Sequence, residues 1–147
     1  MKSWKNLEKT VAKILGGIRH IRVSYSESAP DVEHESLSVE CKYRKSVPEY
    51  LKEMITYSEA YPCRLYRKVP KLVLEGLAQA SSYDKSKIPL LAVRQHNDRL
   101  IYGFMWLNHM PVMWKMPMVV WNDEIAVFNL RNLEKYIKKT RKDLLCF

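Results

Sequence analysis

The sequence has few cysteines and no long apolar run. Its three cysteines, Cys41, Cys63 and Cys146, are odd in number and lie far apart, with no CxxC pair. This argues against a disulfide framework and against a zinc site. No apolar run approaches the ~18 residues of a membrane span, and the first residues form a charged amphipathic stretch without the apolar core of a signal peptide. We therefore expect a soluble, cytoplasmic protein with no membrane partner.

Acidic residues are scarce relative to basic ones. The chain has 25 Lys and Arg against 16 Asp and Glu, which gives a formal net charge of +9. This excess favours a polyanionic partner such as DNA, because each phosphate contact releases counterions, although many basic proteins bind no nucleic acid. The 147 residues are 47% hydrophobic and 28% charged, as is typical of a globular chain. We expect a single domain over residues 1–147.

The stretch PDVEHESLSVECK, residues 30–42, carries the strongest chemical pattern. Residues 36–43 alternate strictly, which predicts a half-buried strand with Glu40 and Lys42 on one face. Asp31 lies in a shorter extended run, and a turn at residues 34–37 would place it opposite Glu40. Facing positions in an antiparallel pair have Cβ atoms about 4.5–5.5 Å apart. Two carboxylates that close repel each other, so the arrangement favours a divalent cation between them.

The chemistry that follows is metal-assisted hydrolysis. Asp31 and Glu40 offer the oxygen ligands that Mg²⁺ or Mn²⁺ prefers, and the backbone carbonyl of Cys41 could add another. A metal-bound water would attack phosphorus. Lys42 could orient that water or stabilise the developing negative charge.

Glu8 is an unusual residue in the first predicted helix, residues 3–15, which Gly16-Gly17 should end. At 100° per residue it falls inside the apolar stripe of that helix. A carboxylate there needs a metal, a lysine or backbone donors as its partner, or it lies at the edge of the stripe and reaches water. If it reaches the motif, it could complete a second metal site or bind a metal-bound water.

The other predicted elements define the fold class. The chain should form a mixed α/β (α+β) sheet flanked by helices. A capping box at Ser46–Glu49 should start the second helix, and Asn129 should cap the last. In chain order we expect a strand over 18–25, a helix over 47–61, an irregular basic connector over 62–70, a helix over 71–83, a hairpin of 88–95 with 100–107, a loop and edge strand over 108–121, a strand over 124–128 and a helix over 129–144.

Two side-chain patterns on the middle helices bear on function. Gln79 and Tyr83 are neighbours on one face of helix 71–83. Tyr50, Tyr57 and Tyr61 fall on one face of helix 47–61. With Arg64 and Arg67 nearby they could stack on bases, but such a stripe more often belongs to the core.

PD followed by ExK resembles the signature of the PD-(D/E)XK nuclease superfamily. The order of Glu8, Gly16-Gly17, Arg19, the motif and Gln79 is similar to that of archaeal-type Holliday junction resolvases and of small phage proteins of the superfamily, over about the first 95 residues. The resemblance implies a restriction-endonuclease-like core, with a mixed sheet of about five strands flanked by helices. It also implies a symmetric homodimer whose two sites each nick one strand of a four-way junction. Residues 46–70 and 108–121 do not match the resolvases.

Matched residue by residue, the resemblance assigns the metal ligands to Asp31 and Glu40, the catalytic lysine to Lys42 and an accessory acid to Glu8. Gln79 could hold the nucleophile or Lys42 in place. A serine before the motif often assists in the resolvases, and Ser24, Ser26 and Ser28 are all candidates. The residues that we expect to contact DNA lie around the motif: Arg19, Arg22, Ser24, Arg44 and Lys45.

The function expected from these patterns is a Mg²⁺-dependent endonuclease that resolves four-way DNA junctions. One alternative is a restriction-like endonuclease, or one that cuts flaps and other branched DNA, of the same superfamily. Another is a basic DNA-binding protein without catalysis. If the chain comes from a phage, as the resemblance allows, it would act inside the host cell.

Overall fold

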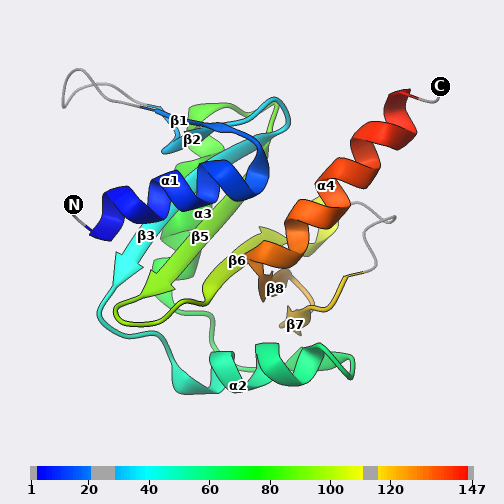
Figure 1. Cartoon of the computed structure of the whole chain (residues 1–147). Coiled ribbons are helices and arrows are strands. Elements are labelled where there is room, and N and C mark those ends of the chain that lie inside the picture. Colours follow the sequence, from blue (N-terminus) through cyan, green and yellow to red (C-terminus); the bar gives the residue numbers. More distant parts are fainter. Residues whose placement is uncertain (1–2, 21–28, 111–115, 146–147) are drawn as a thin grey trace.

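The computed structural model describes residues 3–20, 29–110 and 116–145, which form a mixed eight-stranded sheet with four α-helices (Figure 1). The helices are α1 (Ser3–Leu15), α2 (Glu49–Ser58), α3 (Lys71–Tyr83) and α4 (Leu130–Leu145), with a short 3₁₀ turn η1 (Leu107–His109). The strands are β1 (Ile18–Arg19), β2 (Val32–Glu33), β3 (Leu37–Arg44), β4 (Cys63–Leu65), β5 (Ile88–Gln95), β6 (Ile101–Trp106), β7 (Val119–Trp121) and β8 (Ile125–Asn129).

The strands lie in the order β1-β2-β3-β5-β6-β8-β7-β4. β3 and β5 pair in parallel along their whole length, while β2–β3, β5–β6 and β6–β8 are antiparallel. The mixed α/β class is confirmed, but the sheet of about five strands that the resemblance implied is wrong, because the sheet has eight. The elements expected from the sequence itself include seven of these strands. The unforeseen strand is β4, which pairs in parallel with β7 at the end of the sheet. Its three residues are too few to show an alternating pattern, and prolines flank them.

Each face of the sheet carries its own hydrophobic core. One core contains Leu7, Val11 and Leu133, so α1 and α4 cover that face. The other contains Leu51 and Leu77, so α2 and α3 cover the opposite face. Figure 1 shows α1 in front of the strands, α3 behind them and α2 beneath. The sheet is therefore a central layer between two pairs of helices.

Close contacts fix α3 against the middle of the sheet. A Cβ added to Gly76 would lie 2.6 Å from Leu91 Cδ1, so a larger residue here would displace the Leu91 side chain, and glycine lets α3 pack closely on β5. Ser38 Oγ donates a 2.6 Å hydrogen bond to the Ala80 carbonyl, which ties α3 to β3 as well. These contacts decide which side chains of α3 can reach the strand that carries Glu40 and Lys42.

Other details of the predicted elements agree only in part with the structure. The glycine stop of α1 is confirmed, because Gly16 has φ +69°. The Asn129 cap is also confirmed, since the Arg131 amide donates to Asn129 Oδ1 at 3.1 Å. The capping box is wrong: the residue before α2 is Pro48, which makes no side-chain cap.

The predicted edge strand in residues 108–121 was also misplaced. Its strand portion, β7, lies between β8 and β4 and is therefore an interior strand. Among the described residues, no helix combines the length and the apolar character needed to cross a bilayer.

Candidate active site

The β2–β3 hairpin brings two carboxylates together. Val32 pairs with Val39, and the Asp31 amide donates to the Val39 carbonyl at 2.9 Å. The paired register ends at Val32, because the Asp31 amide bonds to the Val39 carbonyl and the Asp31 carbonyl accepts from the His20 amide at 3.1 Å. The charge of Asp31 nevertheless acts on Glu40, so the two carboxylates lie close together, while the directly facing position expected from the alternation stays a prediction.

The Asp31 carboxylate accepts a 2.8 Å hydrogen bond from the Cys41 amide across the pair. N–H and C=O of a strand residue point to the same side, so the Cys41 carbonyl also faces the β2 side of β3.

Glu40 is almost completely buried, with 3% of its surface exposed. The pKa of its carboxyl is raised to about 7, first by burial and then by the charge of Asp31, while Lys42 acts in the opposite direction. Lys42 Nζ lies 3.2 Å from Glu40 Oε1, and the Tyr83 hydroxyl donates to Glu40 Oε2 at 3.0 Å. Both oxygens of the buried carboxylate are therefore held by side chains.

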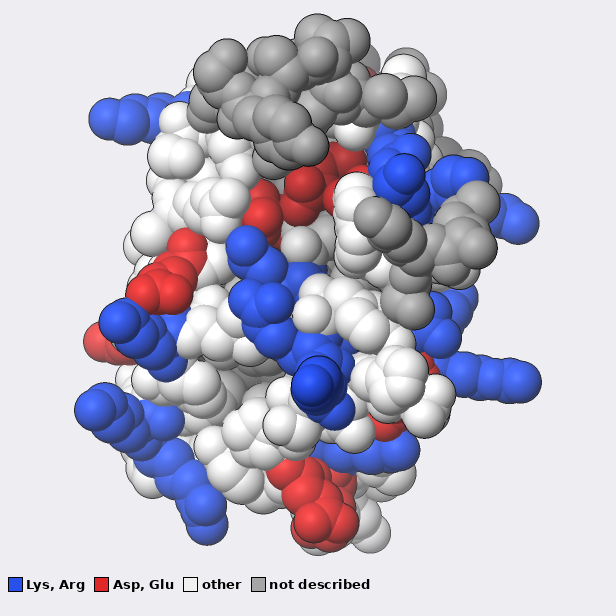
Figure 2. Space-filling view, turned by 90° about the vertical axis from the view of Figure 1, so that its left-hand side faces the viewer, with Lys and Arg blue, Asp and Glu red and all other residues white. Residues whose placement is uncertain are grey.

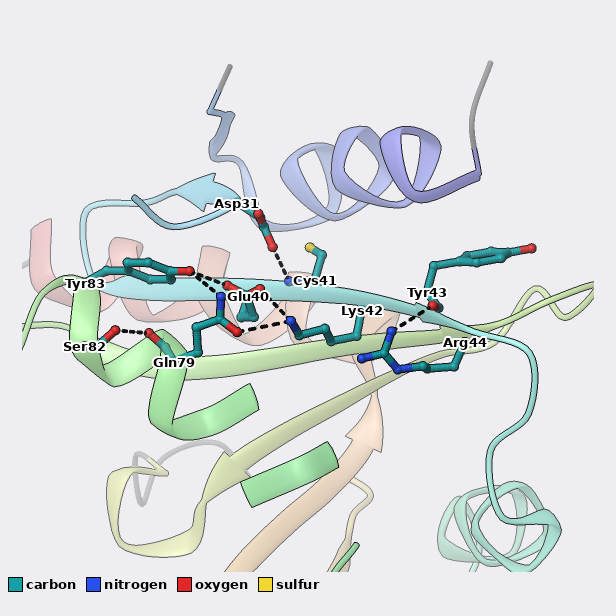
Figure 3. Close-up of polar contacts among 9 residues, drawn as sticks. All are labelled: Asp31, Glu40, Cys41, Lys42, Tyr43, Arg44, Gln79, Ser82 and Tyr83. Atoms are coloured by element: carbon teal, nitrogen blue, oxygen red, sulfur yellow. Dashed lines mark hydrogen bonds and ion pairs between the residues drawn. The ribbon is translucent and has the colours of Figure 1, made fainter. Parts of the chain in front are cut away.

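Four side chains close a ring of hydrogen bonds around Glu40 (Figure 3). Lys42 Nζ donates to Gln79 Oε1 at 3.1 Å, and Gln79 Nε2 donates to the Tyr83 hydroxyl at 2.8 Å. The Tyr83 hydroxyl then donates to Glu40, which lies against Lys42. Two members come from β3 and two from α3, so the ring fixes the helix side chains relative to the strand. Its closure limits the rotamers open to Lys42 and Glu40.

Tyr83 is the member of the ring that sequence reasoning did not assign to the site. Its pKa is raised, first by burial and then by the charge of Glu40. The spacing of Gln79 and Tyr83 by four residues was visible in the sequence and indicated a shared helix face. That spacing indicated that the two residues are neighbours, but no local pattern indicated that their face points at Glu40.

Glu8 is buried and forms an ion pair with Arg19, whose Nε donates to Glu8 Oε1 at 2.9 Å. The sequence-based alternatives for Glu8 did not include an arginine partner. Arg19, which is expected to contact DNA, links β1 to α1 through this ion pair. Glu8 still lies near the motif: burial raises the pKa of the Cys41 thiol, and the charges of Asp31, Glu8 and Glu40 raise it further. The three carboxylates therefore surround one residue of β3.

The donor set suits a hydrated hard cation. In the described part of the chain, no three His, Cys, Asp or Glu side chains are grouped closely enough to cage a metal ion. Mg²⁺ seldom needs such a cage, because it is usually bound by one or two carboxylates and retains several waters. Asp31 and Glu40 provide two carboxylates that repel each other, as the raised pKa of Glu40 indicates. The residues present therefore fit Mg²⁺ or Mn²⁺.

Basic side chains continue from the site along the same face. β3 leads from Glu40 and Lys42 to Arg44, and Lys45 follows directly; both Arg44 and Lys45 are exposed. Figure 2 shows acidic side chains on this face beside a column of Lys and Arg. Two further residues expected to contact DNA, Arg22 and Ser24, lie outside the described residues, as do the candidate serines Ser26 and Ser28.

The site is interpreted from its own geometry. Comparison of the chain with protein-family models, with curated proteins and with solved structures finds no match.

Proposed function

We propose that this chain is a metal-dependent, structure-selective DNA endonuclease of the PD-(D/E)XK superfamily, which resolves four-way junctions by paired phosphodiester hydrolysis. The observation that carries the proposal is the placement of Lys42 beside Glu40, with the Asp31 carboxylate held on the Cys41 amide and close enough for its charge to raise the pKa of Glu40. Glu40 and Lys42 are held by Tyr83 and Gln79, and Asp31 by the Cys41 amide, which is more than an exposed hairpin needs for stability. An exposed ion pair would contribute little.

Asp31 and Glu40 would hold Mg²⁺ or Mn²⁺, with the Cys41 carbonyl as a further oxygen ligand. When bound, such a metal makes a coordinated water a stronger nucleophile and offsets negative charge on the phosphate. The metal also favours the ionised form of Glu40, whose pKa is about 7 without it.

Lys42 supplies the positive charge of the protein at the reacting phosphate. Its ammonium group lies 3.2 Å from Glu40 and donates to Gln79, so it is positioned before substrate arrives. A charge held in place stabilises the negative charge that develops in the transition state, without reorganisation. Gln79 acts by positioning Lys42, and Glu8 acts through the field that it adds near Cys41.

The net charge of +9 and the exposed Arg44 and Lys45 support a DNA substrate. A homodimer belongs to the same proposal, because paired nicks on a four-way junction require two sites related by symmetry. Action on DNA also places the protein inside the cell.

The test compares a four-way junction, a flap and a linear duplex, each incubated with Mg²⁺, Mn²⁺ or EDTA. We expect paired symmetric nicks on the junction with either metal, and none in EDTA. Asp31→Asn and Lys42→Ala should abolish the nicks and leave the fold intact by circular dichroism. Equal cutting of the linear duplex would rule out junction selectivity and favour a restriction-like enzyme. Binding without cleavage under any metal would favour a DNA-binding protein without catalysis.

A further inference from the structure

Three tyrosines and an arginine form an exposed surface far from the candidate active site. Tyr57 and Tyr61 are each 59% exposed and Tyr66 is 65% exposed, which is unusual for large aromatic side chains. The expectation that the tyrosine stripe of the second helix belongs to the core is therefore wrong for Tyr57 and Tyr61. The side chain of Arg64 is 64% exposed. We call Tyr57, Tyr61, Arg64 and Tyr66 the tyrosine surface.

The members of the tyrosine surface are neighbours in space. The rings of Tyr57 and Tyr61 stack, with centroids 5.1 Å apart and planes at 30°. Tyr57 and Arg64 line the same groove of about 430 Å³, next to Met54 and Pro62.

Asp123 joins the remaining two members to each other. It accepts a 2.6 Å hydrogen bond from Arg64 Nη1 and a 3.4 Å bond from the Tyr66 hydroxyl. Guanidinium has five N–H donors, so Arg64 retains donors for a phosphate beyond those that face Asp123.

We propose that the tyrosine surface stacks unpaired bases of a DNA strand that leaves the duplex. Stacked, exposed tyrosines offer π-faces that accept any base, and a neighbouring arginine can bind the backbone phosphate. A second arginine, Arg67, lies over the Tyr50 ring at 4.5 Å and adds positive charge nearby. Glu53 also lines the groove; its carboxylate can accept a hydrogen bond from a base amino group, whereas it would repel a phosphate.

The position of the tyrosine surface in the sheet defines what kind of DNA could reach both this surface and the candidate active site. β4, which carries Arg64, is five strand-to-strand steps from β3 in the sheet order. At about 4.8 Å per step the two strands are roughly 24 Å apart along the sheet. This matches about seven base pairs of duplex at 3.4 Å each. A strand could be cut near Lys42 while an unpaired arm of the same DNA contacts Tyr57.

The same position also explains the two segments that do not resemble the resolvases. Residues 46–70 contain α2 and β4, residues 108–121 contain β7, and β4 pairs with β7 in the register Cys63↔Val119. The two unmatched segments therefore meet at one end of the sheet. This inference rests on the proposed nuclease function for its substrate, and it assigns recognition of unpaired DNA to the unmatched part of the chain.

The test measures binding in EDTA, so that it does not depend on cleavage. A fork with unpaired dT arms and a fully paired duplex with the same number of phosphates are followed by fluorescence anisotropy. We expect the double variant Tyr57→Ala, Tyr61→Ala to bind the fork roughly tenfold or more weakly, as loss of base stacking predicts. Binding of the paired duplex should change less than twofold. The Tyr57→Phe, Tyr61→Phe variant retains the rings and should bind as the wild type does.

A control variant and a crosslinking experiment test whether the effect is specific to the tyrosine surface. Trp4 is an exposed aromatic residue on α1, 45% exposed with Lys5 over its ring at 5.4 Å, and Trp4→Ala should leave the fork preference unchanged. Photo-crosslinking of a fork that carries 5-iodouracil in its arm should map to Tyr57, Tyr61 or Tyr66. An equal loss on fork and duplex, no loss, or crosslinks elsewhere would overturn the proposal.

Parallel cleavage assays with Mg²⁺ separate the two proposals. If the wild type cuts DNA but the alanine double variant binds forks normally, the tyrosine surface is wrongly assigned and the nuclease stands. If forks bind through the tyrosines but no DNA is cut with any metal, the tyrosine surface is correctly assigned and the nuclease proposal is wrong. If the double variant binds DNA normally but loses self-association by light scattering, the surface contacts a second copy of the chain and the proposal is overturned.

Discussion

The Tyr83 hydroxyl donates a 3.0 Å hydrogen bond to Oε2 of the buried Glu40, and it accepts one from Gln79. One hydroxyl therefore links the acid of the motif to the amide that holds Lys42. β3 and α3 are joined through this oxygen.

Removal of the hydroxyl by Tyr83→Phe should slow DNA cleavage by roughly tenfold while the protein remains folded. The lost bond to an ionised carboxylate is worth about 1.5–3 kcal/mol, and part of that loss should appear in the transition state, since Glu40 and Lys42 become less well positioned. Single-turnover rates at saturating enzyme measure the effect. Tyr136→Phe removes a tyrosine hydroxyl on α4, outside the site and the tyrosine surface, and serves as the control. A rate equal to that of the wild type would show that the ring has no role in catalysis.

The pKa of Glu40 predicts how stability depends on pH without metal. The folded state raises this pKa from 4.5 to about 7, so between these values the folded state binds more protons than the unfolded state. The contribution of Glu40 to the unfolding free energy should therefore be largest below about pH 4.5. It should fall as pH rises to 7, by at most roughly 3 kcal/mol.

Thermal or urea unfolding in EDTA checks this pH dependence by comparing the wild type with Glu40→Gln. The glutamine variant has no titrating group at this position. The unfolding free energy of the wild type minus that of Glu40→Gln should therefore decrease from pH 4.5 to 7. A difference that stays constant from pH 4.5 to 7.5 would show that Glu40 ionises normally.

Divalent metal should reverse part of that loss. Mg²⁺ bound between Asp31 and Glu40 would stabilise the folded state by RT ln(1 + [Mg²⁺]/Kd), and protons would compete with it for Glu40. We expect the rise in melting temperature on adding Mg²⁺ to be larger at pH 8 than at pH 5.5. Asp31→Asn should remove most of the rise at both values. An Asp31→Asn protein with an unchanged Mg²⁺ response would place the metal elsewhere.

The Glu8–Arg19 pair should contribute to stability and not to DNA binding. Arg19→Met leaves the buried Glu8 carboxylate without its guanidinium, which should cost about 3 kcal/mol of unfolding free energy. Addition of Glu8→Gln should recover part of this loss, because the buried charge is then gone, and a double-mutant cycle in urea gives the coupling. The salt dependence of DNA binding tests the other role. If Arg19→Met folds but the slope of log affinity against log salt falls by the equivalent of about one phosphate contact, Arg19 makes the expected DNA contact.

Local sequence patterns were sufficient for the hairpin at the centre of the site. A slip of one residue would exchange the faces of Val39 and Glu40, so the alternation in residues 36–43 was sufficient to predict the strand and the shared face of Glu40 and Lys42. Helical periodicity likewise located α1 and α3. These features depend on residues close together in the chain.

The features that the sequence did not reveal depend on contacts between distant segments. Tyr83 reaches Glu40 because Gly76 lets α3 pack closely on β5. No local sequence pattern indicates how closely a helix packs on a strand. Arg19 became the partner of Glu8 through the turn between α1 and β1. The exposure of Tyr57 was misjudged because periodicity defines a face of a helix but does not say which neighbour covers it.

The parallel pairing of β3 with β5 has a consequence for the order in which the molecule forms. Leu37 pairs with Ile88, so this ladder closes a loop of about fifty residues, whereas the hairpin that holds Asp31 and Glu40 is local. Non-local pairings form more slowly during folding. During synthesis on the ribosome, the two carboxylates can therefore come together before Gln79 and Tyr83 have emerged to position Lys42. We expect a nascent chain to acquire its acidic pair early and its complete hydrogen-bonded ring only at a late step.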